Sequence, residues 1–254
     1  MMQHLCTLLF TLLVATTTVA KAQESSSNNQ ILSATLDGYI LPGYATLEAS
    51  TAALASATSL LCETPSRDNL EKAQKRFSKA AAAWARIEWF RIGPVIVDNN
   101  LERMLFYPDR KSTGLRQVQA ALASKDQTTI SVARLSQKSV AMQGLGALEY
   151  LLFGKGHQGL TKATDAYRCA YAKAVGGNLH SVSRAMIKYW REDKSVRKTW
   201  LKPSETNPWF RHEQEAVARL VGTLVHGLEA VKDVRIGAFL RETTDRDRPK
   251  SAVL

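Results

Sequence analysis

The residues best suited to chemistry lie in segment 143–150, which reads QGLGALEY. Glu149 follows Gly146 by three residues, so on a helix the two share a face. An interior glycine destabilises a helix by about 1 kcal/mol relative to alanine, so two of them indicate close approach by another helix or by a ligand. A carboxylate at the edge of an apolar run must be paired or must bind a cation. The segment therefore predicts either a cation-binding site or a salt bridge from Glu149 to Arg91 or Arg103.

A second group of charged and aromatic residues lies in a segment broken by Pro94 and Pro108. Irregular segments between helices often hold binding residues, although this one could equally be a connection. Asp98 is a further carboxylate in this segment that could supplement Glu149. We predict that side chains from this segment and from the glycine segment line one pocket: Arg91, Glu102, Arg103, Asp109 and Gln143.

The histidines complete no standard metal motif. His212 begins a partial H-E-x-x-H, but position 216 is alanine, so the second histidine is missing. His212 with Glu215, and His226 with Glu229, share helix faces, which exposed His–Glu contacts explain. The sequence also lacks G-x-S-x-G and a glycine-rich nucleotide loop after a strand, so these signatures give no support for a serine hydrolase or a nucleotide-binding fold.

The first 22 residues have the layout of a secretory signal peptide. A short polar start precedes an apolar stretch, and residues 20–22 match the A-x-A cleavage pattern. An uncleaved membrane anchor is the alternative, but a span usually needs about 20 apolar residues. We expect residues 1–22 to be removed and residues 23–35 to form a flexible N-terminal segment.

The net charge and its distribution along the sequence indicate which classes of partner are suitable. The chain holds 34 Lys plus Arg against 23 Asp plus Glu, a net charge of +11, and the basic residues are spread along its length. Export makes nucleic acid an unsuitable partner. Weak attraction to anionic envelope surfaces, and hence peripheral association with the outer membrane, is compatible with this charge.

Two cysteines remain after removal of the signal peptide, Cys62 and Cys169. In an oxidising compartment an isolated pair predicts a disulfide, although two separate buried thiols are the alternative. A bridge closing so long a loop is worth roughly 4–5 kcal/mol in the chain-entropy model. Because the sequence has no C-x-x-C pair, neither a thiol redox site nor a cysteine zinc site is supported.

Helical periodicity dominates residues 36–240, which we expect to form one helical domain. Asp68 and Glu71 give one helix a start that resembles a capping box. Because alternating strand patterns are scarce, we predict an all-α fold built as helical bundles, followed by a charged C-terminal tail at 241–254. Long helices are predicted at 69–90, 127–153, 162–192 and 213–240, and shorter ones at 44–62 and 115–124.

Several segments together resemble the imelysin family of envelope proteins. The resemblance covers nearly all of the mature chain, and its middle block is the most specific. It implies imelysin-like helical bundles in two packed halves, each like a four-helix bundle, with the second half incomplete if this branch is short. The matching stretches are RIGP (91–94), LERMLFYPDR (101–110), QGLGALEYLLFG (143–154), YRCAYAKA (167–174) and HEQEAVARL (212–220).

The resemblance also implies residence in the periplasm or cell envelope and a link to iron uptake, with envelope uptake components or a small ligand as partners. The family is classed among metallopeptidases, and its hallmark G-x-H-x-x-E is thought to bind metal. Here the hallmark is Gly144-x-Gly146-x-x-Glu149, so the glutamate is present and the histidine is absent. Glu149 alone is a weak ligand for iron or zinc, since these metals favour imidazole alongside oxygen.

Three functions stay open. The first is a non-catalytic envelope protein that binds a ligand or metal connected with iron uptake. The second is a metallopeptidase in which Glu149 is a ligand or general base and a histidine such as His226 comes from elsewhere. The third is a degenerate structural relative in which Glu149 only forms a salt bridge. We favour the first, without enzymatic activity, because neither H-E-x-x-H nor the full family motif is present.

Family members usually continue past the point where this sequence stops. If helices are missing, the helix at 213–240 exposes part of its apolar stripe, which predicts oligomerisation or poor solubility. The stripe consists of Val217, Leu220, Leu224, Leu228, Val231 and Val234.

Overall fold

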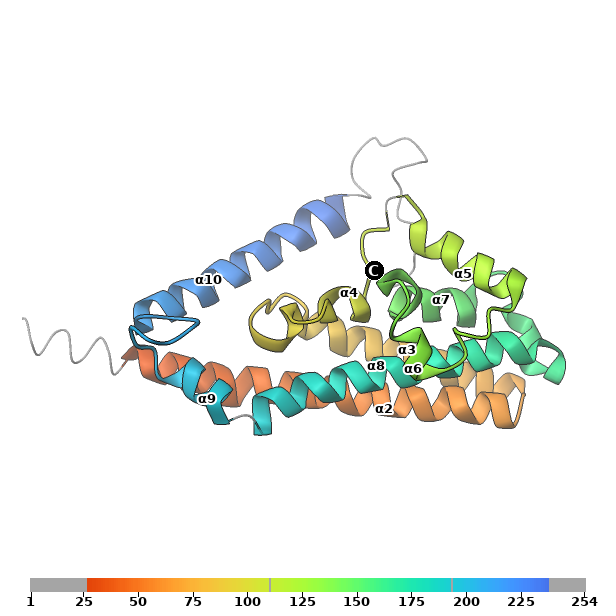
Figure 1. Cartoon of the computed structure of the whole chain (residues 1–254), viewed down its shortest axis with the longest axis horizontal. Coiled ribbons are helices and arrows are strands. Elements are labelled where there is room, and N and C mark those ends of the chain that lie inside the picture. Colours follow the sequence, from red (N-terminus) through yellow and green to blue (C-terminus); the bar gives the residue numbers. More distant parts are fainter. Residues whose placement is uncertain (1–26, 110, 193, 238–254) are drawn as a thin grey trace, which may run out of the picture.

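The computed structural model describes residues 27–109, 111–192 and 194–237, and these residues form an all-α fold without strands. Residues 27–35 are helical and pass through a π-helical turn, Leu36–Ile40, into α2 (Leu41–Glu63). Two further long helices, α3 (Arg67–Ile87) and α8 (Ala166–Glu192), pack against different sides of α2. Figure 1 shows these long helices lying side by side as the base of the molecule.

Shorter helices connect α3 to α8 and cover one side of this base (Figure 1). They are η2 (Gly93–Ile96), α4 (Asn100–Met104), α5 (Thr113–Ser124), α6 (Val132–Leu135), η3 (Val140–Met142), α7 (Leu145–Phe153), η4 (His157–Thr161) and η5 (Ala163–Asp165). After α8 follow α9 (Lys194–Leu201), α10 (Glu213–Ala230) and a π-helical segment η6 (Val231–Ile236).

Small residues let α2 and α8 approach closely. A Cβ added to Gly176 of α8 would lie 2.7 Å from Oγ1 of Thr58 on α2. Seven residues further along α8, the hydroxyl of Ser183 forms a 2.6 Å hydrogen bond with the hydroxyl of Thr51 across the interface, and both side chains are fully buried. Buried polar groups are tolerated when they are paired in this way.

The predicted disulfide is confirmed. Cys62 in the last turn of α2 is bonded to Cys169 in the first turns of α8, with Cα atoms 5.5 Å apart and a sequence separation of 107 residues. The bridge therefore fixes the register of the two helices at one end of their interface.

The predictions for α3, α5 and α8 are confirmed to within a few residues, but the cap of α3 differs. The N-cap is Ser66, whose hydroxyl accepts a hydrogen bond from the backbone N–H of Asn69 at 3.2 Å. Asp68 instead pairs with Lys72 on the exposed face of the helix. The capping-box assignment was therefore two residues too late, because the side chain that caps the helix is the hydroxyl of Ser66.

The single long helix predicted at 127–153 is wrong. The segment is divided into α6, η3 and α7, with extended backbone at Ser131 and again at Gly144. Short helices with buried apolar residues in successive turns imitate the periodicity of one long helix. The breaks arise from local hydrogen bonds that compete with helix formation, described below for Asp126.

The flexible N-terminal segment predicted at 23–35 does not hold for residues 27–35. These residues are helical, and Leu32 is fully buried with its carbonyl accepting a 2.8 Å hydrogen bond from Nε1 of Trp200. The signal peptide predicted at 1–22, residues 23–26 and the charged tail at 241–254 lie outside the described residues.

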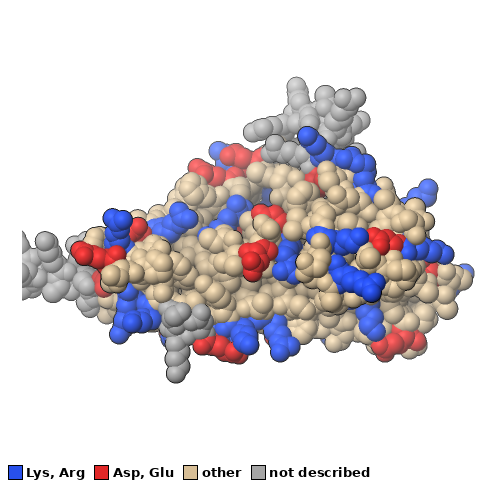
Figure 2. Space-filling model, viewed as in Figure 1, with Lys and Arg blue, Asp and Glu red and all other residues tan. Residues whose placement is uncertain are grey.

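Acidic and basic side chains are interspersed on the face of the molecule shown in Figure 2. This matches the spread of basic residues along the sequence. Among the described helices, none combines the length and the apolar character that a membrane span requires.

Reduction of the Cys62–Cys169 bridge should lower the free energy of unfolding by up to about 4–5 kcal/mol, because the released loop regains chain entropy in the unfolded state. Urea denaturation followed by far-UV circular dichroism, with and without reductant, measures the change. The double variant Cys62→Ser/Cys169→Ser should match the reduced protein and ignore reductant. Equal stability of the wild type in both conditions would contradict the bridge.

Candidate functional site

The segment with the glycine-rich motif crosses the middle of the molecule at the start of α7. Gly144 is the N-cap of this helix and has extended backbone, so it is not interior to a helix as the sequence suggested. A Cβ at this position would lie 2.7 Å from the carbonyl oxygen of Met104 and 2.9 Å from that of Arg103. The absence of a side chain at Gly144 thus allows the backbone of α4 to pass directly against the start of α7.

Beside this crossing lies a buried cluster of polar side chains. Gln143 and Asn178 are each 1% exposed, and the amide nitrogen of Asn178 donates to Oε1 of Gln143 at 3.4 Å. The guanidinium of Arg103 donates to Oε1 of Gln143 and to Oδ1 of Asn178, both at 3.3 Å, and to Oδ1 of Asn100 at 3.4 Å. The charge of Arg103 is therefore met by three amide oxygens from three different segments.

The same segment is tied to α8 by Tyr171. This side chain is fully buried and its hydroxyl donates to the carbonyl of Met142 at 3.0 Å. Burial raises the pKa of Tyr171 above its ordinary value, so the hydroxyl remains a donor across the physiological range.

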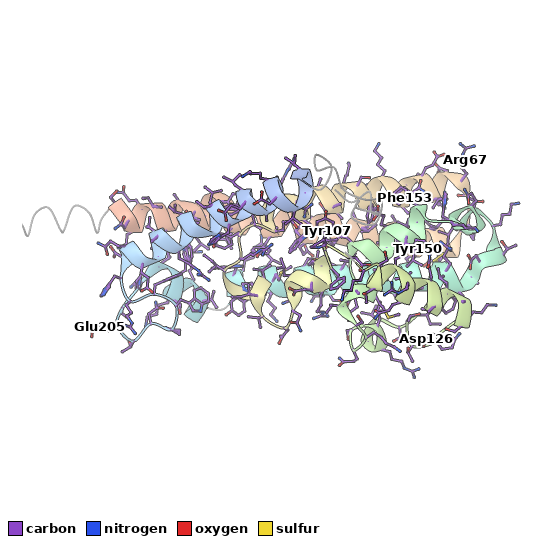
Figure 3. The ribbon with its side chains drawn as sticks, turned by 90° about the horizontal axis from the view of Figure 1, so that it is seen from above. Arg67, Tyr107, Asp126, Tyr150, Phe153 and Glu205 are labelled. Atoms are coloured by element: carbon purple, nitrogen blue, oxygen red, sulfur yellow. A yellow bond between two sulfur atoms is a disulfide. The ribbon has the colours of Figure 1, made fainter. Side chains whose placement is uncertain are left out.

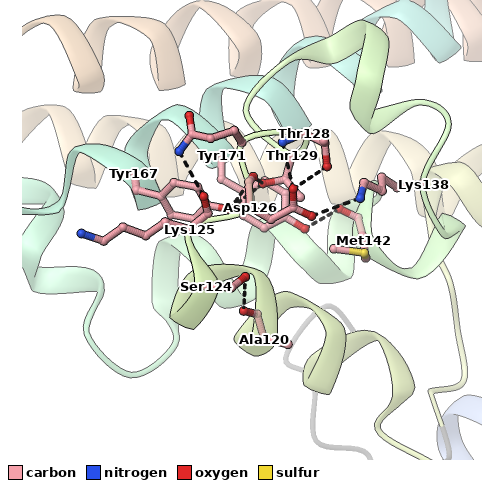
Figure 4. A network of polar contacts seen from close by, with 11 residues as sticks. Ala120, Ser124, Lys125, Asp126, Thr128, Thr129, Lys138, Met142, Tyr167 and Tyr171 are labelled. Atoms are coloured by element: carbon pink, nitrogen blue, oxygen red, sulfur yellow. Dashed lines mark hydrogen bonds and ion pairs between the residues drawn. The ribbon is translucent and has the colours of Figure 1, made fainter.

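A hydrogen-bonded turn around Asp126 holds the chain before the motif (Figure 4). Its carboxylate accepts hydrogen bonds from the hydroxyl of Thr128 at 2.6 Å and from the backbone N–H of Thr128 at 2.9 Å, and it pairs with Lys138 at 3.1 Å. The hydrogen bonds from Thr128, followed by that from Lys138, lower the pKa of Asp126 to about 2. The carbonyl of Lys138 in turn accepts a 2.6 Å hydrogen bond from Nε2 of Gln143. The turn at Asp126 is thereby connected to the buried cluster.

The C-terminal end of α7 is held by Arg168, which is 6% exposed. Its guanidinium donates to the carbonyls of Tyr150, Leu151 and Lys155 at 3.3, 3.2 and 2.7 Å, and it pairs with Asp165 at 3.1 Å. The carbonyl of Tyr150 also accepts from the backbone N–H of Gly154 at 2.9 Å, so Arg168 shares it. A cation at a helix C-terminus also interacts favourably with the helix dipole. The short helix α7 is therefore fixed at both ends by side chains from α8.

Gly146 and Glu149 lie on the outer side of this fixed helix, and both are partly exposed. A Cβ added to Gly146 would meet no atom within 4 Å. The two glycines of the motif thus have different physical roles, since Gly144 is enclosed by backbone and Gly146 faces open space. Figure 3 labels Tyr150 and Phe153 of the same helix, which lie in the half of the molecule that ends at Arg67 and far from Glu205.

The other predicted pocket residues have separate positions. The carboxylate of Asp109 accepts hydrogen bonds from the backbone N–H groups of Thr113, Gly114 and Leu115 at 2.6, 2.9 and 3.2 Å, so it caps the start of α5. Glu102 is partly exposed on α4.

Arg91 and Asp98 are exposed in the segment between α3 and α4. Burial raises the pKa of Glu88, and the positive charges of Arg235 and Arg91 oppose this rise. Of the five predicted pocket residues, the structure directly joins Gln143 and Arg103.

The histidine pairs are partly as expected from the sequence. His226 and Glu229 contact each other at 3.1 Å on the exposed face of α10. Glu215, however, accepts a hydrogen bond from the backbone N–H of Arg211 at 2.7 Å and so stabilises the start of α10. Figures 1 and 3 place α10 over the half of the molecule opposite to α7.

Sequence reasoning missed Arg168, Tyr171 and Asn178, although all three hold the motif. A signal was present in their spacing, because positions three, seven and ten residues apart lie on one helix face. Strongly polar residues on a face that otherwise carries Val175 and Val182 indicate buried hydrogen-bond partners. No single motif reveals which carbonyls they reach.

The imelysin family model matches residues 40–252 of this chain. The chain belongs to the imelysin family. Its fold is also that of a crystal structure of an imelysin-like protein from Psychrobacter arcticum 273-4, with a TM-score of 0.69 and 20% sequence identity. The similarity covers 83% of this chain and 62% of that protein, so this imelysin-family chain spans about three fifths of its relative's length. A comparison with curated protein sequences finds no match.

In this imelysin-family protein the donor set around α7 does not fit iron or zinc. Gly146 contributes no ligand, Gln143 is turned into the buried cluster, and the carboxylate of Asp109 is occupied by backbone N–H groups. Within residues 27–109, 111–192 and 194–237, no three or more His, Cys, Asp or Glu side chains gather as a metal site would require. Of the motif's histidine and glutamate positions, only Glu149 carries a side chain that could be a ligand.

Substitution of the two motif glycines by alanine should have opposite effects. Gly144→Ala should destabilise the protein by about 1–3 kcal/mol, because the new methyl group clashes with backbone carbonyls that cannot rotate away. Gly146→Ala should stabilise it by up to about 1 kcal/mol, because the methyl group enters open space in a helix. Urea denaturation of the two variants in parallel measures both changes. Destabilisation by both substitutions would contradict the open environment of Gly146.

Proposed function

We propose that this protein is an exported imelysin-like binding protein that acts in the cell envelope in connection with iron uptake and has no catalytic activity of its own. The signal-peptide layout of residues 1–22 supports export, and the net charge of +11 favours contact with anionic envelope surfaces. Family membership supports the link to iron. The observation that carries the proposal is Gly146, where the family motif's histidine is replaced by open space on an otherwise well-fixed helix.

The construction of the site supports binding more than catalysis. Both ends of α7 are fixed by buried polar contacts from α8, which leaves the outer side, with Gly146 and Glu149, as its accessible surface. A rigid helix with a partly exposed carboxylate suits recognition of a ligand or of an envelope uptake component. Because the donor set does not fit a free iron or zinc ion, we expect the ligand to be a small molecule or a protein surface.

A metallopeptidase requires a metal-bound water and therefore at least two or three protein ligands. The candidate histidine, His226, is exposed on α10 and contacts Glu229. Since α10 and α7 occupy different halves of the molecule, His226 is not positioned to complete a site with Glu149 (Figure 1). This arrangement favours the non-catalytic alternative.

Deletion of the gene should slow growth when ferrous iron is scarce and leave growth unchanged when iron is abundant. The protein should fractionate with the periplasm or the outer membrane of the wild type. Complementation with the wild-type gene should restore growth, and complementation with Glu149→Gln should restore it less well although the variant folds normally. Equal growth of the deletion strain at all iron levels would remove the link to iron.

Restoration of the family's histidine should create a metal response that the wild type lacks. Gly146→His places an imidazole one helical turn before Glu149, in open space, so the pair can bind Zn²⁺ or Fe²⁺. Thermal melts should show a melting temperature independent of metal for the wild type and one that rises with metal for Gly146→His. The double variant Gly146→His/Glu149→Gln should lose most of the rise.

Insulin cleavage separates the two functional classes. The wild-type protein should leave insulin intact over long incubation. Cleavage that a chelator abolishes, together with a metal-dependent melting temperature of the wild type, would overturn the non-catalytic proposal in favour of a metallopeptidase. A wild type that neither binds metal nor affects growth on scarce iron would identify a purely structural relative.

A further inference from the structure

The helix α10 and its continuation η6 carry an unusual share of exposed apolar surface. Twelve large hydrophobic side chains are exposed in the described part of the chain, and half of them lie between Glu213 and Ile236. Contiguous exposed apolar surface on a soluble protein commonly marks an interaction site. The six residues are Val221, Leu224, Val225, Leu228, Val231 and Ile236.

Four of these residues form a regular seam. Val221, Leu224, Leu228 and Val231 follow one another at intervals of three, four and three residues. This is the spacing of the a and d positions at which one helix packs along another. Leu228 is the most exposed of them, at 61%. The seam therefore has the geometry of a surface that receives a second helix.

The rest of the molecule already uses a different face of α10. Ala216, Thr223 and Gly227 are buried, and a Cβ added to Gly227 would lie 2.7 Å from Cβ of Trp89. Beyond the helix end, Arg235 forms an ion pair with Glu88. Rotation of α10 to bury the seam against its own domain would break these contacts. The seam is therefore exposed because a different face of α10 packs on the domain.

Arg235 also lies over the ring of Tyr107, with its guanidinium carbon 5.2 Å from the ring centroid. The cation–π contact adds to the ion pair with Glu88 and fixes the end of η6. The seam is therefore presented from a helix that is held at both its middle and its end.

We propose that the α10 seam is the contact surface between two copies of this chain, which pair through antiparallel α10 helices about a twofold axis level with His226, the midpoint of the seam, so that Val221 meets Val231 and Leu224 meets Leu228. A second copy supplies a seam of identical spacing, so the surface is self-complementary, as an isologous interface requires. The seam residues are all aliphatic, so pairing brings no like charges together within it. Antiparallel helices also oppose their dipoles favourably, whereas parallel helices do not.

The extent of the surface sets the strength of the association. The 24 residues from Glu213 to Ile236 form a rod of about 36 Å at about 1.5 Å per residue. One pair of helices of this length buries less than about 1,200 Å² in total, which is typical of weak, reversible complexes. Figure 1 shows α10 along an outer edge of the molecule, apart from α2 and α8, where a second molecule can approach it.

Sedimentation velocity of the purified protein over a range of about 1–300 μM tests the proposal, since weak complexes of this kind dissociate in that range. The wild type should show a sedimentation coefficient that rises with concentration toward that of a dimer. Leu228→Glu and Leu224→Glu should each weaken association at least tenfold, with unchanged far-UV circular dichroism. The matched control is Leu60→Glu on α2, because Leu60 and Leu224 have the same exposure of 45%. This variant should associate like the wild type.

A cysteine beside the proposed axis tests the geometry without adding charge. Val225→Cys should form an interchain disulfide on mild oxidation, much faster than Leu60→Cys does. A wild type that stays monomeric over the whole range would overturn the proposal and leave the seam to a different partner. Equal loss of association in Leu60→Glu and Leu228→Glu, or no preferential cross-linking at position 225, would overturn the α10-to-α10 contact.

Discussion

The structure depends on the close antiparallel contact of α2 with α8, which repeats every seven residues along α8. Cys169, Gly176 and Ser183 meet Cys62, Thr58 and Thr51 through a covalent bond, a near-contact that only glycine permits, and a buried hydrogen bond. Each contact requires small or bonded side chains, so the two helices lie closer than large apolar residues would allow. The neighbouring face of α8 carries Arg168, Tyr171 and Asn178, which hold the motif segment. Because α8 is fixed by its contact with α2, that contact also sets the position of α7.

The parts of this arrangement that local patterns determine could be predicted from sequence. The apolar periodicity of α3 and α8 and the isolated cysteine pair identified two long helices and the bridge correctly. The segment 127–153 could not be resolved in the same way, because its breaks depend on hydrogen bonds made by Asp126 and on the backbone of α4 at Gly144. The first contacts are made by polar side chains and the second joins residues distant in sequence, and apolar periodicity carries no information about either.

The candidate site shows the same division. The motif positions Gly144, Gly146 and Glu149 could be recognised by resemblance, and the structural difference between the two glycines could not. The pairing of Arg103 with Gln143 was within the predicted set, but its neutral amide partners Asn100 and Asn178 were not foreseen. A charge satisfied by amides leaves the acidic side chains of the region available for other contacts, as Asp109 illustrates by capping α5. The family fold is therefore present, while position 146 of the motif carries glycine, which offers no donor atom.

The seven-residue repeat between α2 and α8 also limits how this molecule can move. A sliding motion of one helix along the other would have to carry Gly176 past Thr58 while the bonded cysteines hold the end in place, and a shift of a fraction of a turn would bring a Cβ-bearing residue against the facing backbone. Shear motion at this interface is therefore blocked, and large rearrangements must occur as hinge motions of elements mounted on it. The helix α10 is held at Trp89 through Gly227 and at Glu88 through Arg235, so a hinge motion of this helix would have to break both contacts together.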